Sequence, residues 1–243
     1  MTYFRRLKCY SILNSQPSTL NSQLTPMPEP LIPQRFLFRF AAPCRYREPI
    51  WTPQGTGLDE TYRLAGLATL EGRRQSAEVR AGWSEAGLGF WVGVTGKRQK
   101  PWCRDSRPDD SDGLHVWIDT RDVHDVHRAS RFCHRFVFLP VGAGASHTQP
   151  VAQWLPINRA RAQPRAFSAD SLQVRSKLQK GGYTLEAFIA AEALTGFDPR
   201  EYPRLGFAYA VLDRELGEQT FGVGSPMPYQ EDPSLWATLE LVR

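Results

Sequence analysis

The sequence predicts an all-β fold, namely a two-sheet antiparallel β-sandwich of jelly-roll or immunoglobulin-like type with little helix. Apolar and polar residues alternate with a period of two through most of the chain after residue 76, as they do in strands with one buried face. Only residues 190–195 suggest a helix, of one or two turns. Many strands with almost no helix are typical of sandwiches and barrels.

The expected strands follow one another along the second half of the chain. Six segments carry the alternation: 76–83, 88–94, 114–118, 173–180, 183–189 and 205–211. Residues 135–141 are almost wholly apolar, as in a strand covered on both faces. Residues 235–242 form the last expected strand. Gly181-Gly182 indicates a tight two-residue hairpin turn between its flanking strands.

Two stretches, residues 96–111 and 142–171, lack a regular pattern. The first gathers arginines, lysines and aspartates around Trp102, and the second is rich in Ala, Arg, Gln and Pro. Irregular segments of this length in a compact domain are commonly functional or disordered.

Residues 1–26 differ from the rest of the chain. Leu13-Asn14-Ser15-Gln16 recurs as Leu20-Asn21-Ser22-Gln23, a polar repeat with nothing to bury. We interpret this segment either as a disordered tail or as an extension upstream of a true start at Met27, and we favour the second. Residues 27–75 are expected to supply an N-terminal strand and loops, and residues 76–243 the core sandwich.

Composition limits the classes of partner. Hydrophobic residues make up 41% of the 243 residues and charged residues 23%, ordinary globular values. Residues 1–26 hold three Lys or Arg and no acid, so the net charge of +5 falls to +2 without them. That small excess argues against a nucleic-acid partner. No apolar run approaches the roughly 18 residues of a membrane span, and no secretion signal is recognised, so we expect a cytoplasmic protein with no membrane partner. The scattered cysteines, none in a C-x-x-C pair, favour free thiols, with a Cys44–Cys103 or Cys103–Cys133 bridge as the alternative.

Four segments in order resemble strand motifs of the family 9 carbohydrate-binding modules and their wider relatives. They are Trp83-Ser84-Glu85 with Leu88–Val92, Asp112-Gly113-Leu114-His115-Val116-Trp117-Ile118-Asp119, Gly181–Ile189, and Leu205-Gly206-Phe207 through Asp213. The resemblance covers about residues 76–242. It implies a β-sandwich of jelly-roll type, in agreement with the alternation.

The resemblance also implies a sugar site. Sugar-binding members clamp a pyranose between two aromatic side chains, and the matching positions here are Trp102 and Tyr229. An aromatic ring face suits the apolar face of a sugar. Arg104, Asp105 and His115 are the polar candidates of this site. His115 stands where the family's acidic strand has a carboxylate, and extra residues separate Trp102 from Asp112, so the fold is inherited more readily than the site.

These observations predict a non-catalytic carbohydrate-binding module that requires no cofactor, with a carbohydrate or a protein as partner. The first alternative is a protein-interaction or structural domain that kept the fold without sugar binding. The second is a glycoside hydrolase that uses Asp119 and Glu186 as its carboxylate pair. Asp112 and Asp119 are the candidate ligands of a structural calcium ion, because calcium prefers oxygen ligands. The histidines from His124 to His134 lie among arginines, so we interpret that segment as a solvated connector rather than a metal site.

Overall fold

The structure is a computed structural model that describes residues 34–67, 70, 72, 74–225 and 227–243. The segment 1–26 therefore lies outside the described residues. The strands are β1 (Ala41–Tyr46), β2 (Ala77–Ser84), β3 (Gly87–Thr95), β4 (Gly113–Asp119), β5 (Cys133–Ala143), β6 (Gln149–Trp154), β7 (Leu172–Gln179), β8 (Gly182–Ala190), β9 (Arg204–Asp213), β10 (Gly217–Thr220) and β11 (Ala237–Val242).

Helical structure in the described residues is limited to short 3₁₀ turns. They are η1 (Gln34–Leu37), η2 (Glu60–Tyr62), η4 (Pro108–Asp110), η5 (Ala169–Ser171), η6 (Ala191–Ala193) and η7 (Pro233–Leu235). The helix expected at residues 190–195 is the single turn η6. Among these residues no helix is long and apolar enough to cross a membrane.

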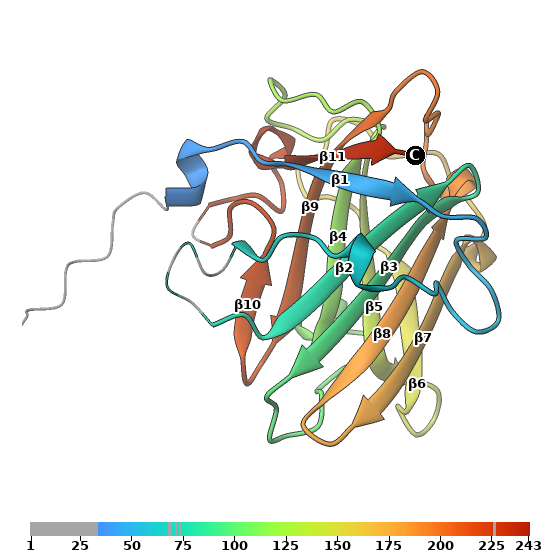
Figure 1. The fold of residues 1–243 in the computed structure, drawn as a ribbon, viewed down its shortest axis with the longest axis vertical. Helices are drawn as coiled ribbons and strands as arrows, with labels where there is room; N and C mark the ends of the chain where they lie inside the picture. The colour runs from blue at the N-terminus through green and yellow to red at the C-terminus, as the bar shows by residue number, and fades with distance from the viewer. Residues whose placement is uncertain (1–33, 68–69, 71, 73, 226) are drawn as a thin grey trace, which may run out of the picture. The chain divides into compact units, whose positions relative to one another are not determined.

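The described strands form one continuous mixed sheet. Its order is β6-β5-β4-β9-β11-β1-β2-β3-β8-β7, and β10 pairs with β9 beside this path. β1 is parallel to both of its neighbours, whereas the other pairs are antiparallel. Figure 1 shows β2, β3, β8 and β7 in front of β4, β5 and β6, with β1 and β11 side by side at the top.

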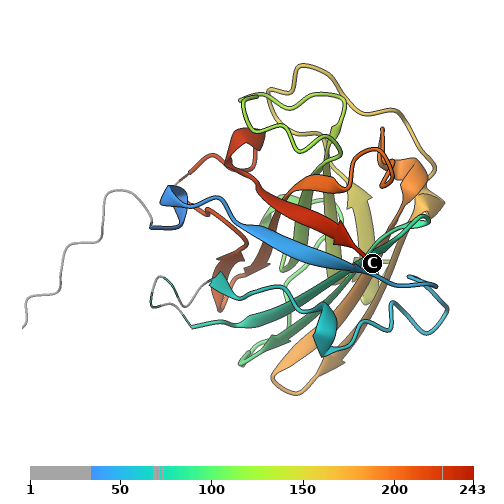
Figure 2. The same cartoon turned by 45° about the horizontal axis from the view of Figure 1, so that its top comes forward.

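The predicted division into two separate antiparallel sheets is not confirmed, because β1 joins the two halves. It pairs along its length with β11, and its last two residues, Arg45 and Tyr46, pair with β2. The halves then curve around one core, as Figure 2 shows from the end that carries β1 and β11. Phe90 on β3 and Phe207 on β9 stack across that core, with ring centroids 6.0 Å apart.

All eight segments predicted as strands are strands in the structure. β1 lies within residues 27–75, where an N-terminal strand was expected without bounds, whereas β6 and β10 were not predicted. β6 contains Pro150 and two glutamines, and β10 is only four residues long. β6 lies in the stretch 142–171 that lacked a pattern. The cysteines at positions 44, 103 and 133 are buried free thiols, as predicted.

The two halves differ on the side that faces away from the core. On β8, buried residues alternate with half-exposed ones, whereas all seven residues of β4 are buried. A second apolar cluster covers the outer face of β4 and β9. It is built from strand residues and from the connecting segments: Trp117, Ala129, Cys133, Ile157, Ala208, Ala210, Val223, Tyr229 and Trp236.

Candidate functional site

Three polar side chains meet on the covered outer face of the β5-β4-β9 half. His115 and Trp117 lie on β4, and Arg135 lies directly opposite Trp117 on β5. Strand alternation sends Val116 and Phe136 into the core, so the three polar side chains point the other way. We call His115, Trp117, Arg135 and the adjoining Tyr229 the outer cluster.

The members of the outer cluster touch one another. The guanidinium of Arg135 lies 5.2 Å from the centroid of the Trp117 ring, and its NH2 nitrogen is 3.3 Å from Nδ1 of His115. The His115 and Trp117 rings stack with centroids 6.0 Å apart. Tyr229 meets Trp117 edge to face at 5.3 Å. The cluster is therefore a buried group of packed aromatic rings with a cation at its side.

Three nitrogens of the outer cluster are buried without a hydrogen-bond partner among the described residues: Nε2 of His115, Nε1 of Trp117 and Nε of Arg135. A guanidinium only donates, so Nδ1 of His115 is the acceptor and its proton sits on Nε2. All three unpartnered groups are thus N–H donors. A buried unpaired donor costs about 1–3 kcal/mol, and such groups commonly mark a place where a ligand or water supplies the acceptor.

Burial keeps the cluster's titratable members neutral. Desolvation, helped by the charge of Arg135, lowers the pKa of His115 to about 3. Desolvation and the hydrogen bond to Glu218 raise the pKa of Tyr229 above its ordinary value. At neutral pH the cluster therefore offers uncharged imidazole, indole and phenol groups beside one guanidinium.

A surface depression of about 250 Å³ is connected to the outer cluster through hydrogen bonds, although none of the cluster's own residues lines it. Its lining includes Asp109 and Glu218. Asp109 accepts a hydrogen bond from Arg135 at 2.5 Å, and Glu218 accepts one from the Tyr229 hydroxyl at 2.5 Å. The cluster contributes hydrogen-bond donors and the carboxylates of the depression contribute acceptors, so this region contains both.

Trp102 lies at the rim of this region. Its ring is half-buried, and the guanidinium of Arg214, which lines the depression, lies 3.4 Å from the ring centroid. Arg104 and Arg107 lie near the same ring at 5.5 and 5.8 Å. Three arginine side chains therefore surround the Trp102 indole.

The other predicted polar residues fall at the periphery. Arg104 donates to the carbonyl oxygen of Cys103, and Asp105 is exposed, its carbonyl oxygen accepting from Gln153. His115 is the predicted polar residue that the structure places in the outer cluster.

Trp102 and Tyr229 have different environments. Tyr229 is 1% exposed, and its carbonyl oxygen accepts from Nε1 of Trp236 at 2.7 Å. Because Tyr229 packs against Trp117 and Arg214 lies over Trp102, the two rings do not stand as an open pair of free faces in this structure.

The candidate calcium ligands stand at opposite ends of β4, roughly 20 Å apart at the rise of an extended strand, so they do not share one site. Asp112 accepts from the Lys97 ammonium at 3.1 Å and from the backbone N–H groups of Trp102 and Arg214. Asp119 accepts from the backbone N–H groups of Arg121 and Val123. In the described part of the chain, no group of three or more His, Cys, Asp and Glu side chains is arranged to hold a metal ion.

The carboxylate pair of the hydrolase alternative is not brought together. Asp119 lies at the end of β4, whereas Glu186 lies on the outer face of the other half, where its Oε1 accepts from the Thr56 hydroxyl at 3.2 Å. The core separates the two carboxylates, so they do not flank a common substrate position.

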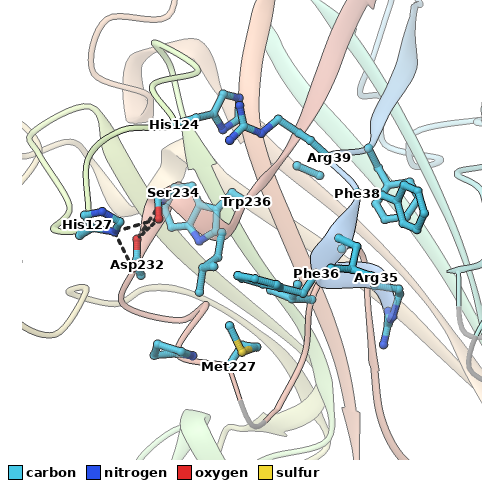
Figure 3. Close-up of a pocket in the computed structure, with 17 residues that line it drawn as sticks. Arg35, Phe36, Phe38, Arg39, His124, His127, Met227, Asp232, Ser234 and Trp236 are labelled. Atoms are coloured by element: carbon cyan, nitrogen blue, oxygen red, sulfur yellow. Dashed lines mark hydrogen bonds and ion pairs between the residues drawn. The ribbon is translucent and has the colours of Figure 1, made fainter. Parts of the chain in front are cut away.

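The histidines also diverge. His124 contacts Asp122 at 2.8 Å, and the buried His134 accepts from the backbone N–H of Thr195 at 2.8 Å. Nδ1 of His127 lies 3.1 Å from Asp232 and 3.0 Å from Ser234. A cavity of about 550 Å³ lies beside this last group. Figure 3 shows His127, Asp232 and Ser234 pointing toward one another on one of its walls, with Phe36 on the other side.

Sequence reasoning missed Arg135, Asp109, Glu218 and Arg214 as site residues. Arg135 opens an otherwise apolar strand, and a charge in such a run is the signal that would have found it. Glu218 and Arg214 carry no comparable signal, because the β9–β10 hairpin brings them to the site from far along the chain.

No protein-family model matches the chain, and no curated protein matches its sequence. The solved structures similar to it include two of a carbohydrate binding module family 9 from Caldicellulosiruptor kristjanssonii. The one in complex with cellotriose has a TM-score of 0.54 at 13% identity, covering 84% of this chain and 94% of that chain. The one in complex with glucose has a TM-score of 0.53 at 14% identity, covering 83% of this chain and 95% of that chain. The resemblance in fold predicted from the four strand motifs is thereby confirmed.

Proposed function

We propose that the chain is a non-catalytic carbohydrate-binding domain that holds a sugar ring in the depression beside the outer cluster. The observation that carries the proposal is the set of three buried N–H donors without acceptors on His115, Trp117 and Arg135. Sugar hydroxyls supply acceptors for such donors, and they also donate to carboxylates such as Asp109 and Glu218. The fold shared with family 9 modules, two of which are in complex with cellotriose and glucose, supports the same function.

In this proposal Trp102 contacts the apolar face of the sugar, and polar groups beside the outer cluster bind its hydroxyls. The half-buried Trp102 ring provides an apolar surface at the rim for a sugar face. Asp109 and Glu218 in the lining hold the hydroxyls and fix the ring's orientation, and Arg135 of the outer cluster donates to Asp109 from behind. Tyr229 positions Trp117 and Glu218 rather than stacking on the sugar itself.

The test is a titration of the whole chain with glucose, cellotriose and a wider panel of mono- and oligosaccharides. Calorimetry and tryptophan fluorescence measure the binding. We expect saturable binding that weakens at least tenfold in Trp102→Ala. Trp91→Ala is the matched control, because Trp91 is a half-buried indole under an arginine on the opposite half. Equal weakening in both variants would contradict the location of the site.

The same titration, repeated with calcium and with a chelator, tests whether Asp112 or Asp119 binds calcium. If calcium binds, we expect it to raise the unfolding temperature; Asp119→Asn abolishes that rise if the ion binds at Asp119, and Asp112→Asn abolishes it if the ion binds at Asp112.

A protein-interaction domain remains the second candidate, favoured by three consecutive exposed apolar residues. Phe36, Leu37 and Phe38 are 43, 69 and 64% exposed, whereas exposed apolar residues on ordinary surfaces are scattered singly. Lack of saturable binding by any saccharide, from a chain with a native near-ultraviolet spectrum, would overturn the carbohydrate proposal in favour of this one.

A further inference from the structure

A second cavity, of about 440 Å³, lies away from the proposed sugar site, where the two ends of the sheet approach each other. β6 and β7 are the first and last strands of the sheet order, and they contact each other (Figure 1). The segment between them, residues 155–171, closes the cavity together with the end of β6 and the start of β7. Its volume is in the range of cavities that bind small molecules.

The lining of this cavity is apolar and aromatic. Trp154 at the end of β6 and Phe167 in the connecting segment are both half-buried, and most of the remaining lining residues are alanines, a proline and a leucine. Phe167 packs against Phe136 of the core, with ring centroids 6.2 Å apart, so this wall is continuous with the interior of the protein. Such a lining suits the apolar body of a ligand.

The charge on the lining is positive only. No Asp or Glu lines the cavity, and the exposed Arg165 is its one charged residue. No carboxylate contact to the Arg165 guanidinium is found in the described residues, although its backbone N–H is fixed by a hydrogen bond to Thr195 at 2.9 Å. The indole N–H of Trp154 is likewise buried with no partner there. Both free groups donate hydrogen bonds, so the polar end of a ligand must accept them.

We infer that this cavity binds a small amphipathic carboxylate, with an apolar body of the size of a medium-chain fatty acid. The apolar body lies against Trp154 and Phe167, and the carboxylate meets Arg165, with the Trp154 N–H as the second donor. A charge-assisted hydrogen bond is about twice as strong as a neutral one, so the carboxylate is preferred to an alcohol of the same length. The site is independent of the depression beside the outer cluster.

The test uses octanoate and 1-octanol as probes in calorimetric titrations of the whole chain. We expect saturable octanoate binding, weaker 1-octanol binding, and a loss of roughly tenfold in octanoate affinity in Arg165→Gln with 1-octanol unaffected. Arg161→Gln is the matched control, because Arg161 is an exposed arginine of the same segment that does not line the cavity. It should bind octanoate as the wild type does.

Trp154→Phe keeps an aromatic ring and removes the N–H, and it should weaken octanoate binding while near-ultraviolet circular dichroism stays native. Two results would overturn the inference. One is no octanoate binding by the wild type, and the other is equal weakening by Arg165→Gln and Arg161→Gln, which would indicate attraction to the general surface charge.

Discussion

The outer faces of the two halves of the sheet differ in how their outward-pointing polar side chains are paired. On the β2-β3-β8-β7 half, the outward residues are half-exposed and pair with one another: Arg80 binds Glu78 and lies over Trp91, and Glu186 accepts from Thr56. On the β5-β4-β9 half, the outward residues are buried under distant segments, and three of them keep unpaired donors. A face built only for stability would pair or remove such donors. This difference is the reason for placing the proposed binding site at the covered face.

The largest effect is expected where both halves meet. Phe207 is fully buried, and its ring stacks on Phe90 across the core and also contacts Phe221 and its strand neighbour Tyr209. Phe207→Ala should lower the free energy of unfolding by about 3–5 kcal/mol, because it leaves a cavity between the halves. Phe188→Ala, on the half-exposed outer face, should lower it by less than half as much. Urea denaturation measures both, and equal losses would contradict a core shared by the two halves.

Strands in which apolar and polar residues alternate could be predicted from the sequence. The segments that pack over those strands could not. Alternation shows that His115 and Trp117 share a face of β4. It does not show that Val223, Tyr229 and Trp236 pack over that face, because this contact joins positions more than a hundred residues apart. The same limit hid Glu218, which the β9–β10 hairpin places beside Tyr229. β1 was expected only as a strand somewhere within residues 27–75, because its six residues are mostly small and include Pro43, so the sequence did not set its bounds.

The free energy of unfolding should fall in acid, because His115 and His134 are buried as neutral imidazoles. Burial lowers the pKa of His115 to about 3 and that of His134 to about 4. Below the unfolded-state pKa of about 6.5, the unfolded chain binds protons that the folded chain does not. The contribution of each histidine is therefore complete above about pH 6.5 and is lost as the pH falls toward the folded value. Each should remove about 2 kcal/mol between pH 6.5 and pH 5.

Urea denaturation at several pH values measures this loss, and His115→Phe supplies the control. The variant should lose less stability over the same pH interval, because only His134 of the buried pair remains. An unchanged pH dependence in His115→Phe would mean that His115 takes up a proton in the folded state, contrary to its buried position beside Arg135.

The smallest change in stability should accompany the sharpest change in function. His115→Phe removes an unpaired buried N–H and keeps an aromatic ring against Trp117, but it also removes the Nδ1 acceptor of Arg135, whose Nη2 still donates to Asp109. The two changes oppose each other, so the free energy of unfolding at neutral pH should stay within about 1 kcal/mol of the wild type. If the outer cluster binds sugar hydroxyls, the same variant should bind the best saccharide of the panel at least tenfold more weakly. His134→Phe is the matched change, because it takes away the acceptor of the Thr195 N–H and should destabilise by about 1–3 kcal/mol without altering saccharide binding. A His115→Phe variant that is strongly destabilised would mean that the covered face serves stability after all, and the contrast between the two halves would then lose its functional meaning.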